Sequence, residues 1–225
     1  MGSADARQRG RRSRSRRGLK LWQETIVLVA LAILVSVVVK AFFVQMFYVP
    51  SGSMKPLFAV NDRILVEKIS YWSGDVQRGD VVVFSDPGHW LGVAPDVEGV
   101  HKLLSLVGLY PSGGHLVKRV VGVGGDHVVC CDDRGRLTVN GEPVAESDYL
   151  AEGTAPSEEK FDVRVPADSL WVMGDNRSNS QDSRAHQRLP NGGAVPVDDV
   201  VGKVWAIVWP WDRTQILDDP DLQAG

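Results

Sequence analysis

The longest uncharged apolar run of the 225-residue chain lies close to its N-terminus, at Ile26 to Val39. The sequence from Trp22 to Phe43 is largely apolar as well, with Lys40 near its end. About 20 apolar residues in a helix cross a bilayer. A cleaved secretory signal is the alternative, but the run is long for one and no small-residue cleavage site follows it. We therefore predict a transmembrane signal anchor over residues 21–44.

Beyond the anchor, apolar residues come in short runs divided by Gly, Pro, Asp and Asn, a pattern typical of strands and turns. Strands are predicted at 63–66, 81–84, 117–123, 127–131, 136–139, 161–165, 170–173 and 200–209. Asn140-Gly141 suits the positive φ angles of a type I′ turn and predicts a hairpin there. The fold class we expect is mainly β, with coiled antiparallel sheets behind one N-terminal transmembrane helix.

These patterns divide the chain into an anchor, a β-rich domain and two tails. The β-rich domain is expected over residues 45–216. Within it, we expect 85–116 to be a surface insertion rich in Gly, Pro and Asp, with room for one short helix, and 132–169 to be a hairpin region. Residues 217–225 form a C-terminal tail.

The net charge of −3 conceals a strongly basic N-terminus. Residues 1–20 hold eight Lys or Arg and one acidic residue, Asp5, and we expect this tail to be disordered. An Arg-rich tail on a soluble protein can bind nucleic acid. Next to an apolar span, however, positive flanks mark the cytoplasmic side. The sequence favours a single-pass protein of the cell membrane with its N-terminus in the cytoplasm, its β-rich domain outside, and no nucleic-acid partner.

Pro50-Ser51-Gly52-Ser53-Met54 follows directly after the anchor and carries two hydroxyl groups in a tight turn. A serine hydroxyl becomes an effective nucleophile only when a neighbouring base removes its proton. The Ser53 amide and the Ser51 hydroxyl are spaced to stabilise an oxyanion. Taken alone, the motif also fits an ordinary turn.

Lys118 is the candidate base, because it lies in the apolar segment 117–123. Strand alternation places it on the face opposite Arg119. Burial among apolar neighbours disfavours the ammonium form and lowers the pKa of a lysine. The alternative is a strand-edge lysine whose amine reaches solvent. A histidine base is disfavoured, because no serine–histidine–aspartate arrangement is evident.

Two further polar features add to this picture. The segment Gly174–Arg184 is dense in Asp, Arg and Ser, and fits either a loop joined by charge-assisted hydrogen bonds or a solvated loop. The adjacent Cys130 and Cys131 fit either a vicinal disulfide or two thiols on opposite faces of a strand. A zinc site is disfavoured, because no second Cys or His pair has suitable spacing.

Together these segments resemble type I signal peptidase (leader peptidase), the serine–lysine dyad family that removes signal peptides from exported proteins. The resemblance covers the anchor and the segments Tyr48–Pro56, Gly79–Phe84, Lys118–Asp126 and Gly174–Arg184, in order. Each motif alone is moderately specific, whereas the ordered set behind an N-terminal span is highly specific.

The resemblance implies a role for each matching position. Ser53 matches the nucleophile and Lys118 the general base. Ser51 matches the serine that completes the oxyanion hole with the Ser53 amide, and Ser180 the serine that hydrogen-bonds the lysine. Support falls to an ion pair, Asp182 and Arg184, and to two structural partners, Asp175 and Arg119. The positions that line the family's small-residue pockets are Phe47, Val49, Met54 and Val117.

The activity expected from this resemblance is endopeptidase cleavage of preproteins at the membrane, with small residues at the first and third positions before the cut. Preproteins and membrane lipid are the implied partners, and no metal or organic cofactor is required. Two alternatives stay open: a catalytically silent, membrane-tethered binding module, and a self-cleaving serine–lysine protease of the repressor type.

Overall fold

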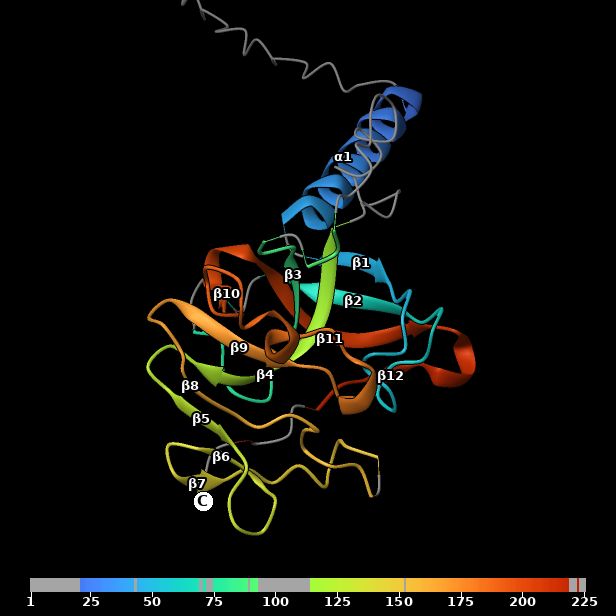
Figure 1. Cartoon of the computed structure of the whole chain (residues 1–225). Helices are drawn as coiled ribbons and strands as arrows, with labels where there is room; N and C mark the ends of the chain where they lie inside the picture. The colour runs from blue at the N-terminus through green and yellow to red at the C-terminus, as the bar shows by residue number, and fades with distance from the viewer. Residues whose placement is uncertain are drawn as a thin grey trace, which may run out of the picture. The chain divides into compact units, whose positions relative to one another are not determined.

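The computed structural model describes residues 21–42, 44–68, 71, 75–88, 90–92, 114–151, 153–218 and 222. The basic tail over 1–20 and the centre of the expected insertion therefore lie outside the described residues. The chain divides into two compact units, Met1–Val38 and Val39–Gly225. The second unit holds the strands and is coloured from light blue to red in Figure 1.

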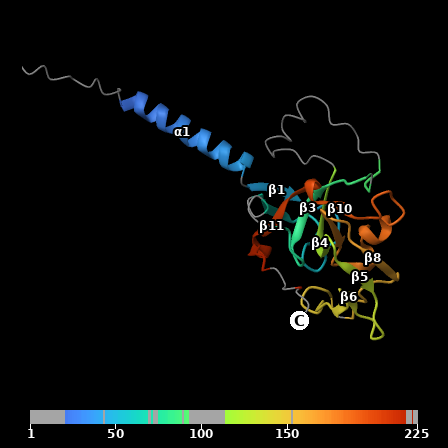
Figure 2. The ribbon, with the colours of Figure 1, turned by 90° about the vertical axis from the view of Figure 1, so that its left-hand side faces the viewer.

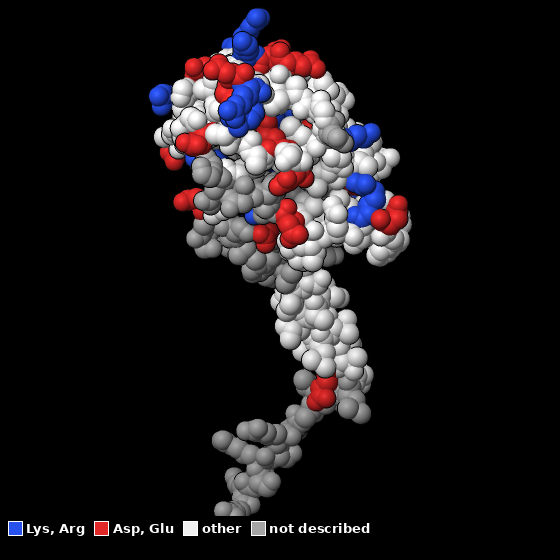
Figure 3. All heavy atoms as spheres, turned by 90° about the horizontal axis from the view of Figure 1, so that it is seen from below, with Lys and Arg blue, Asp and Glu red and all other residues white. Residues whose placement is uncertain are grey.

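One α-helix, α1, covers Leu21–Phe42. It begins with an acidic residue in its first turn, Glu24, where the helix dipole favours negative charge. Its large apolar side chains from Ile26 to Val35 are more than half exposed, and its described surface carries no other charge in Figure 3. Within the described part of the chain, no helix combines the length and apolar character that crossing a membrane requires.

An eight-stranded antiparallel sheet forms most of the second unit (Figures 1 and 2). The strand order is β1-β2-β11-β3-β4-β9-β10, with β12 paired to β11. The bounds are β1 Val44–Tyr48, β2 Arg63–Glu67, β3 Val81–Ser85, β4 His115–Val123, β9 Ser169–Met173, β10 Val195–Pro196, β11 Val200–Trp209 and β12 Gln215–Ile216. Register shifts within β11 and between β4 and β9 mark bulges, which bend and twist a sheet.

A smaller antiparallel sheet has the order β7-β6-β5-β8. Its bounds are β5 His127–Cys130, β6 Leu137–Val139, β7 Glu142–Pro143 and β8 Phe161–Arg164. Figure 1 places it at the far end of the second unit from β1. The β6–β7 hairpin turns through Asn140 and Gly141, both with positive φ, so the type I′ turn predicted from Asn-Gly is confirmed.

The mainly β expectation is confirmed, and all eight predicted strands are present with small changes at their ends. Sequence reasoning missed β1, because Val44–Tyr48 continues the apolar run of the anchor and offers no visible boundary. It also missed β10 and β12, which are two residues long and too short to show a period. Within the described residues, the connections between strands contain four 3₁₀-helices: η1 Arg177–Asn179, η2 Ser183–His186, η3 Val197–Asp199 and η4 Trp211–Arg213.

Three clusters of buried apolar side chains form the core of the second unit. One lies around Met54, Phe58 and Ile64, beneath the serine motif. Another lies around Phe84, Trp90 and Val172. The third joins the two sheets around Trp171 and Leu137, and Leu222 of the expected C-terminal tail packs into it. The serine motif, β4 and the loop after β9 thus rest on well-packed elements.

Candidate active site

Ser53 lies on the loop that follows β1, and only 7% of its surface is exposed. Backbone hydrogen bonds close the base of this loop: Val49 N–H donates to Asp62 O and Asn61 N–H to Val49 O, each at 2.9 Å. Met54, the next residue, is fully buried in the core below. The buried Met54 side chain therefore holds this loop against the core, while Ser53 faces the neighbouring strand.

Lys118 lies on β4, opposite Val82 of β3, and is 4% exposed. Its Nζ lies 2.8 Å from Ser53 Oγ, and it donates a hydrogen bond to the Val117 carbonyl at 3.0 Å. The structure therefore brings together the two residues that sequence analysis selected as nucleophile and base, across 65 positions of the chain.

Burial lowers the pKa of Lys118 from its ordinary 10.5 to about 8. The nearby carboxylates Asp182 and Asp175 oppose this shift, because negative charge stabilises the ammonium form, whereas Arg184 adds to it. A large fraction of the amine is thus neutral near pH 8. A neutral amine 2.8 Å from a hydroxyl can accept its proton.

The loop after β9 clamps the serine loop from the other side. Asn176 donates its backbone N–H to Ser53 O and its Nδ2 to Gly52 O, both at 3.0 Å. Gly174 allows this approach, because a Cβ there would lie 2.5 Å from Ser53 O and would also overlap Ser180. The sequence contained both residues in a polar motif, but nothing in it indicated that Asn176 fastens the serine loop.

The two other serines assigned from the resemblance, Ser51 and Ser180, differ in exposure. Ser51 Oγ is 3.3 Å from Ser53 Oγ, on the exposed side. The Ser180 hydroxyl is buried and near enough to Asp182 to lower the pKa of that carboxyl. It makes no hydrogen bond of normal geometry with any described residue.

Asp182 and Arg184 form a buried ion pair beside the Lys118 amine. Arg184 donates its Nε and Nη2 to the Asp182 carboxylate at 2.9 and 2.8 Å, and Gly174 N–H donates to it at 2.9 Å. Burial opposes ionisation, yet these bonds keep the pKa of Asp182 below its ordinary value. Ser183, between the two, accepts a hydrogen bond from Val172 N–H and so ties the pair to β9.

Arg119 and Asp175 form a second buried pair, on the opposite face of β4 from Lys118. Two parallel hydrogen bonds of 2.8 and 2.7 Å join the guanidinium to the carboxylate, and Arg119 also donates to Gly79 O at 2.9 Å. Such two-point pairing fixes geometry as well as charge. The pair links β4, which carries Lys118, to the loop after β9, whose Asn176 binds the serine loop.

A third buried pair involves the hairpin region 132–169, which the family resemblance implies is variable. Glu146 lies 2.6 Å from Arg177 and accepts a hydrogen bond from Tyr149 at 2.8 Å. The Tyr149 ring contacts the Arg119 guanidinium, whose Cζ is 4.4 Å from the ring centre. Residues 146–149 thus support β4 and the loop after β9. A buried glutamate next to a tyrosine carried no motif that could have revealed this role.

The residues assigned to substrate pockets lie around one apolar cluster. Val49 and Met54 are buried within it, and Phe47 and Val117 are partly buried against it. The Phe47 ring also packs on His115, with 5.3 Å between ring centres. Of these four residues, only Phe47 and Val117 are partly exposed.

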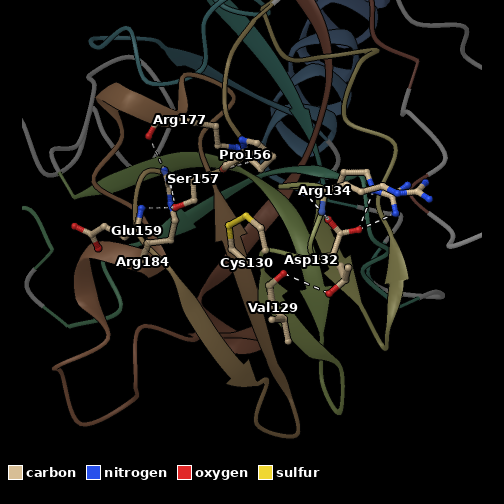
Figure 4. Close-up of a disulfide and its surroundings, with 12 residues drawn as sticks. Val129, Cys130, Asp132, Arg134, Pro156, Ser157, Glu159, Arg177 and Arg184 are labelled. Carbon is tan, nitrogen blue, oxygen red and sulfur yellow. Dashed lines mark hydrogen bonds and ion pairs between the residues drawn. A yellow bond between two sulfur atoms is a disulfide. The ribbon is translucent and has the colours of Figure 1, made fainter.

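Cys130 and Cys131 form a disulfide at the end of β5, which decides between the two alternatives left open by the sequence. Figure 4 shows Pro156 and Ser157 in its surroundings. Pro156 O accepts a hydrogen bond from Arg177, and Ser157 Oγ accepts one from Arg184. Among the described residues, no group of three or more His, Cys, Asp or Glu side chains is placed to hold a metal ion.

Comparison with known proteins gives matches over most of the chain. A family model described as "Signal peptidase, peptidase S26" matches residues 22–209. Signal peptidase I of Mycobacterium tuberculosis H37Rv is 39% identical over 230 aligned positions, which cover 90% of this chain and 78% of that protein. A protein of Mycobacterium leprae named probable signal peptidase I is 37% identical, with 91% and 82% covered.

A solved structure of a signal peptidase I from Enterococcus faecalis also matches, at 22% identity and a TM-score of 0.37. That match covers 57% of this chain and 96% of the solved one.

Proposed function

The chain belongs to the signal peptidase family, peptidase S26, and from this membership we propose that Ser53 and Lys118 are its catalytic dyad. The chain is a hydrolase, and its activity is the cleavage of signal peptides from preproteins. The observation that carries the assignment of the dyad is the 2.8 Å separation of Lys118 Nζ and Ser53 Oγ in a buried setting.

The proposed reaction begins with the neutral Lys118 amine. One N–H points to Val117 O, which leaves the nitrogen lone pair free to accept the Ser53 proton. Ser53 Oγ then bonds to the carbonyl carbon of the scissile peptide, and the amine becomes an ammonium. Lys118 returns this proton to the leaving amine, and the C–N bond breaks to leave an ester on Ser53. Water then hydrolyses the ester with Lys118 again as base.

The oxyanion formed in this attack needs hydrogen-bond donors aimed at it. We assign this role to the Ser53 amide and the Ser51 hydroxyl, which lies 3.3 Å from Ser53 Oγ. Ser180 is proposed to orient the Lys118 amine during turnover, because its buried hydroxyl makes no hydrogen bond of normal geometry with a described residue and lies near Asp182, whose charge acts on that amine. Asp182 and Arg184, with Asp175 and Arg119, hold the surrounding loops in place.

Selectivity for small side chains is proposed to come from the apolar surface next to Ser53. Val49 and Met54 are fixed in the core, so they leave little space for a large side chain. Phe47 and Val117 are partly exposed and can contact the substrate. Small residues at the first and third positions before the cut fit such a surface.

Membrane attachment is the second part of the proposal. We assign the apolar segment 21–44, of which α1 is part, as the anchor, with the basic residues 1–20 in the cytoplasm and the strands outside. The exposed apolar side chains of α1 support this, as do the exposed tryptophans Trp205, Trp209 and Trp211, because Trp is enriched where protein meets lipid headgroups. Carbonate extraction of membranes that contain the full chain tests the attachment. Protease added from outside tests whether the strands lie on that side. Release of the intact chain into the soluble fraction would disprove the anchor.

The dyad is tested by cleavage of a peptide that carries alanine at the first and third positions before the cut. Ser53→Ala and Lys118→Arg should each abolish cleavage, because arginine keeps the charge but is not deprotonated. Lys203→Arg is the matched control. Lys203 lies on β11 and pairs with Asp80, so this variant should retain activity. The rate should rise with pH through a limb near 8, where Lys118 loses its proton. Normal activity in Lys118→Arg would eliminate the dyad.

A further inference from the structure

The stem of the 85–116 insertion is folded onto the loop that holds Asp182. Asp86 accepts hydrogen bonds from Gly88 N–H at 3.2 Å, Trp90 N–H at 2.7 Å and Leu91 N–H at 3.0 Å. Its own N–H donates to Gly114 O at 2.8 Å, where the chain returns to the sheet. This turn delivers the Trp90 side chain into the domain, where it is 8% exposed.

Trp90 stacks on His186. The two rings are parallel to within 3° and their centres are 4.2 Å apart. Phe84 also contacts Trp90 in a T-shaped arrangement, with 5.8 Å between the ring centres. Trp90 Nε1 is buried with no hydrogen-bond partner among the described residues. Ring contacts therefore hold the indole, and no hydrogen bond from Nε1 to a described residue does, so the contribution of Trp90 here is its stacking surface.

His186 in turn holds the backbone of Asp182. His186 Nδ1 lies 2.8 Å from Asp182 O. A carbonyl oxygen can only accept, so Nδ1 carries the proton and the histidine acts as a donor. The same carbonyl accepts Ala185 N–H at 3.0 Å, and the Asp182 side chain caps η2 through Arg184 N–H. Stacking on Trp90 holds the plane of the His186 ring in which this bond is made.

We propose that Trp90 and His186 are positioning residues that hold the Asp182 loop at its distance from the Ser53–Lys118 pair. This inference rests on the function proposed above, because it assigns the two rings a purpose in that reaction. The insertion is then more than a surface excursion, since its stem braces the catalytic loop from the outer side. In this proposal His186 is not a catalytic base: it acts through Asp182 and does not contact the substrate.

The expected consequence is specific to position and charge. The Asp182 carboxylate stabilises the ammonium form of Lys118. If the loop shifts while Lys118 stays buried, the opposing effects of Asp182 and Arg184 on the pKa of Lys118 both weaken. Asp182 has the larger effect of the two, so the pH limb of the rate moves to lower pH, while the displaced loop lowers the maximal rate. A merely structural loss would reduce the amount of folded enzyme but would leave the limb where it is.

The experiment compares the full chain with His186→Ala and Trp90→Ala, and measures kcat, KM and the pH profile on the alanine-containing peptide. We expect kcat to fall roughly tenfold, as small displacements of catalytic groups do. KM should stay within about twofold, and the pH limb should fall by about 0.5 pH unit. His186→Asn, which retains a donor near the Nδ1 position, and Trp90→Phe, which retains a ring, should recover most of the rate.

Two control variants lie outside this contact. His127→Ala removes a histidine that pairs with Asp162 on the smaller sheet, and Leu91→Ala removes an exposed side chain next to Trp90. Both should keep the kcat and the pH limb of the unmodified chain. Thermal unfolding of every variant establishes that the molecules measured are folded.

The two proposals fail in distinguishable ways. If the unmodified chain does not cleave, or if Ser53→Ala cleaves as well as it does, the dyad is wrong. If cleavage depends on Ser53 and Lys118 but folded His186→Ala and Trp90→Ala keep both kcat and the pH limb, the positioning role is wrong. A lower kcat with an unmoved limb, not recovered by His186→Asn or Trp90→Phe, also overturns it.

Discussion

Two Asp–Arg turns in this molecule use nearly the same local chemistry with very different surroundings. In the turn between β5 and β6, Asp132 caps the backbone N–H groups of Arg134 and Arg136 and pairs with the Arg136 side chain at 2.7 Å. Next to the dyad, Asp182 caps Arg184 N–H and pairs with the Arg184 side chain at 2.8 Å. Figure 4 labels Asp132 and Arg184 in the surroundings of the Cys130–Cys131 disulfide.

Burial separates the two turns. The Arg136 and Asp132 side chains are 44% and 23% exposed, whereas those of Arg184 and Asp182 are 8% and 0% exposed. Water screens the first pair, so its effect ends at its own turn. The second pair is shielded from water, and its charges act on the pKa of Lys118. An identical interaction thus shapes a surface turn in one place and the chemistry of the dyad in the other.

Removing the arginine from each turn should give the largest contrast. Arg184→Ala leaves the Asp182 carboxylate buried without its partner, which should lower the free energy of unfolding by about 3–5 kcal/mol. Arg136→Ala, in the solvated turn, should leave the urea midpoint close to that of the unmodified chain. Equilibrium unfolding in urea measures both. Equal losses in the two variants would contradict the role given to burial.

A glycine associated with each turn also differs in its surroundings: Gly174, whose N–H donates to Asp182, is closely packed, whereas Gly135 is not. Gly174→Ala should reduce kcat by about 100-fold, because its Cβ would displace the Ser53 carbonyl and Ser180. Gly135→Ala meets nothing within 4 Å, but φ is +75° there, so we expect about 1 kcal/mol of destabilisation and unchanged kcat. Peptide cleavage and urea unfolding separate the effects. Full activity in Gly174→Ala would show that the serine loop is not held by this contact.

Removing the carboxylate charge should produce the smallest change, a shift in pH dependence. Below pH 8 Lys118 holds its proton and cannot act as a base, so the rate rises as pH passes through its pKa. Asp182→Asn removes a negative charge that stabilises the ammonium form of Lys118. The positive charge of Arg184 remains and disfavours that form. The limb should therefore move to lower pH, by about 1 pH unit. Asp132→Asn should leave it in place, and an upward shift in Asp182→Asn would contradict the assigned sign.

The strands were predictable where apolar residues form runs with clear ends, as in Val200–Trp209, whose bounds agree residue for residue. They were not where a run has no end in the sequence, as at β1, or where the strand is two residues long. The serine motif and Lys118 could be found because each is a compact local pattern. Asn176, Glu146 and Tyr149 could not, since their roles depend on partners distant along the chain.

The mainly β class, the turn at Asn140-Gly141 and the selection of Ser53 and Lys118 follow from consecutive residues, because local backbone preference and short motifs depend on neighbours in the chain. Three facts emerge only from the folded molecule: Lys118 is buried within 2.8 Å of Ser53 Oγ, Asp182 and not Asp132 acts on its pKa, and Trp90 reaches His186. They could not be read from the sequence, because water exclusion and contacts between distant segments arise when strands pair and pack. The same Asp and Arg residues acquire their strength from where the sheet places them.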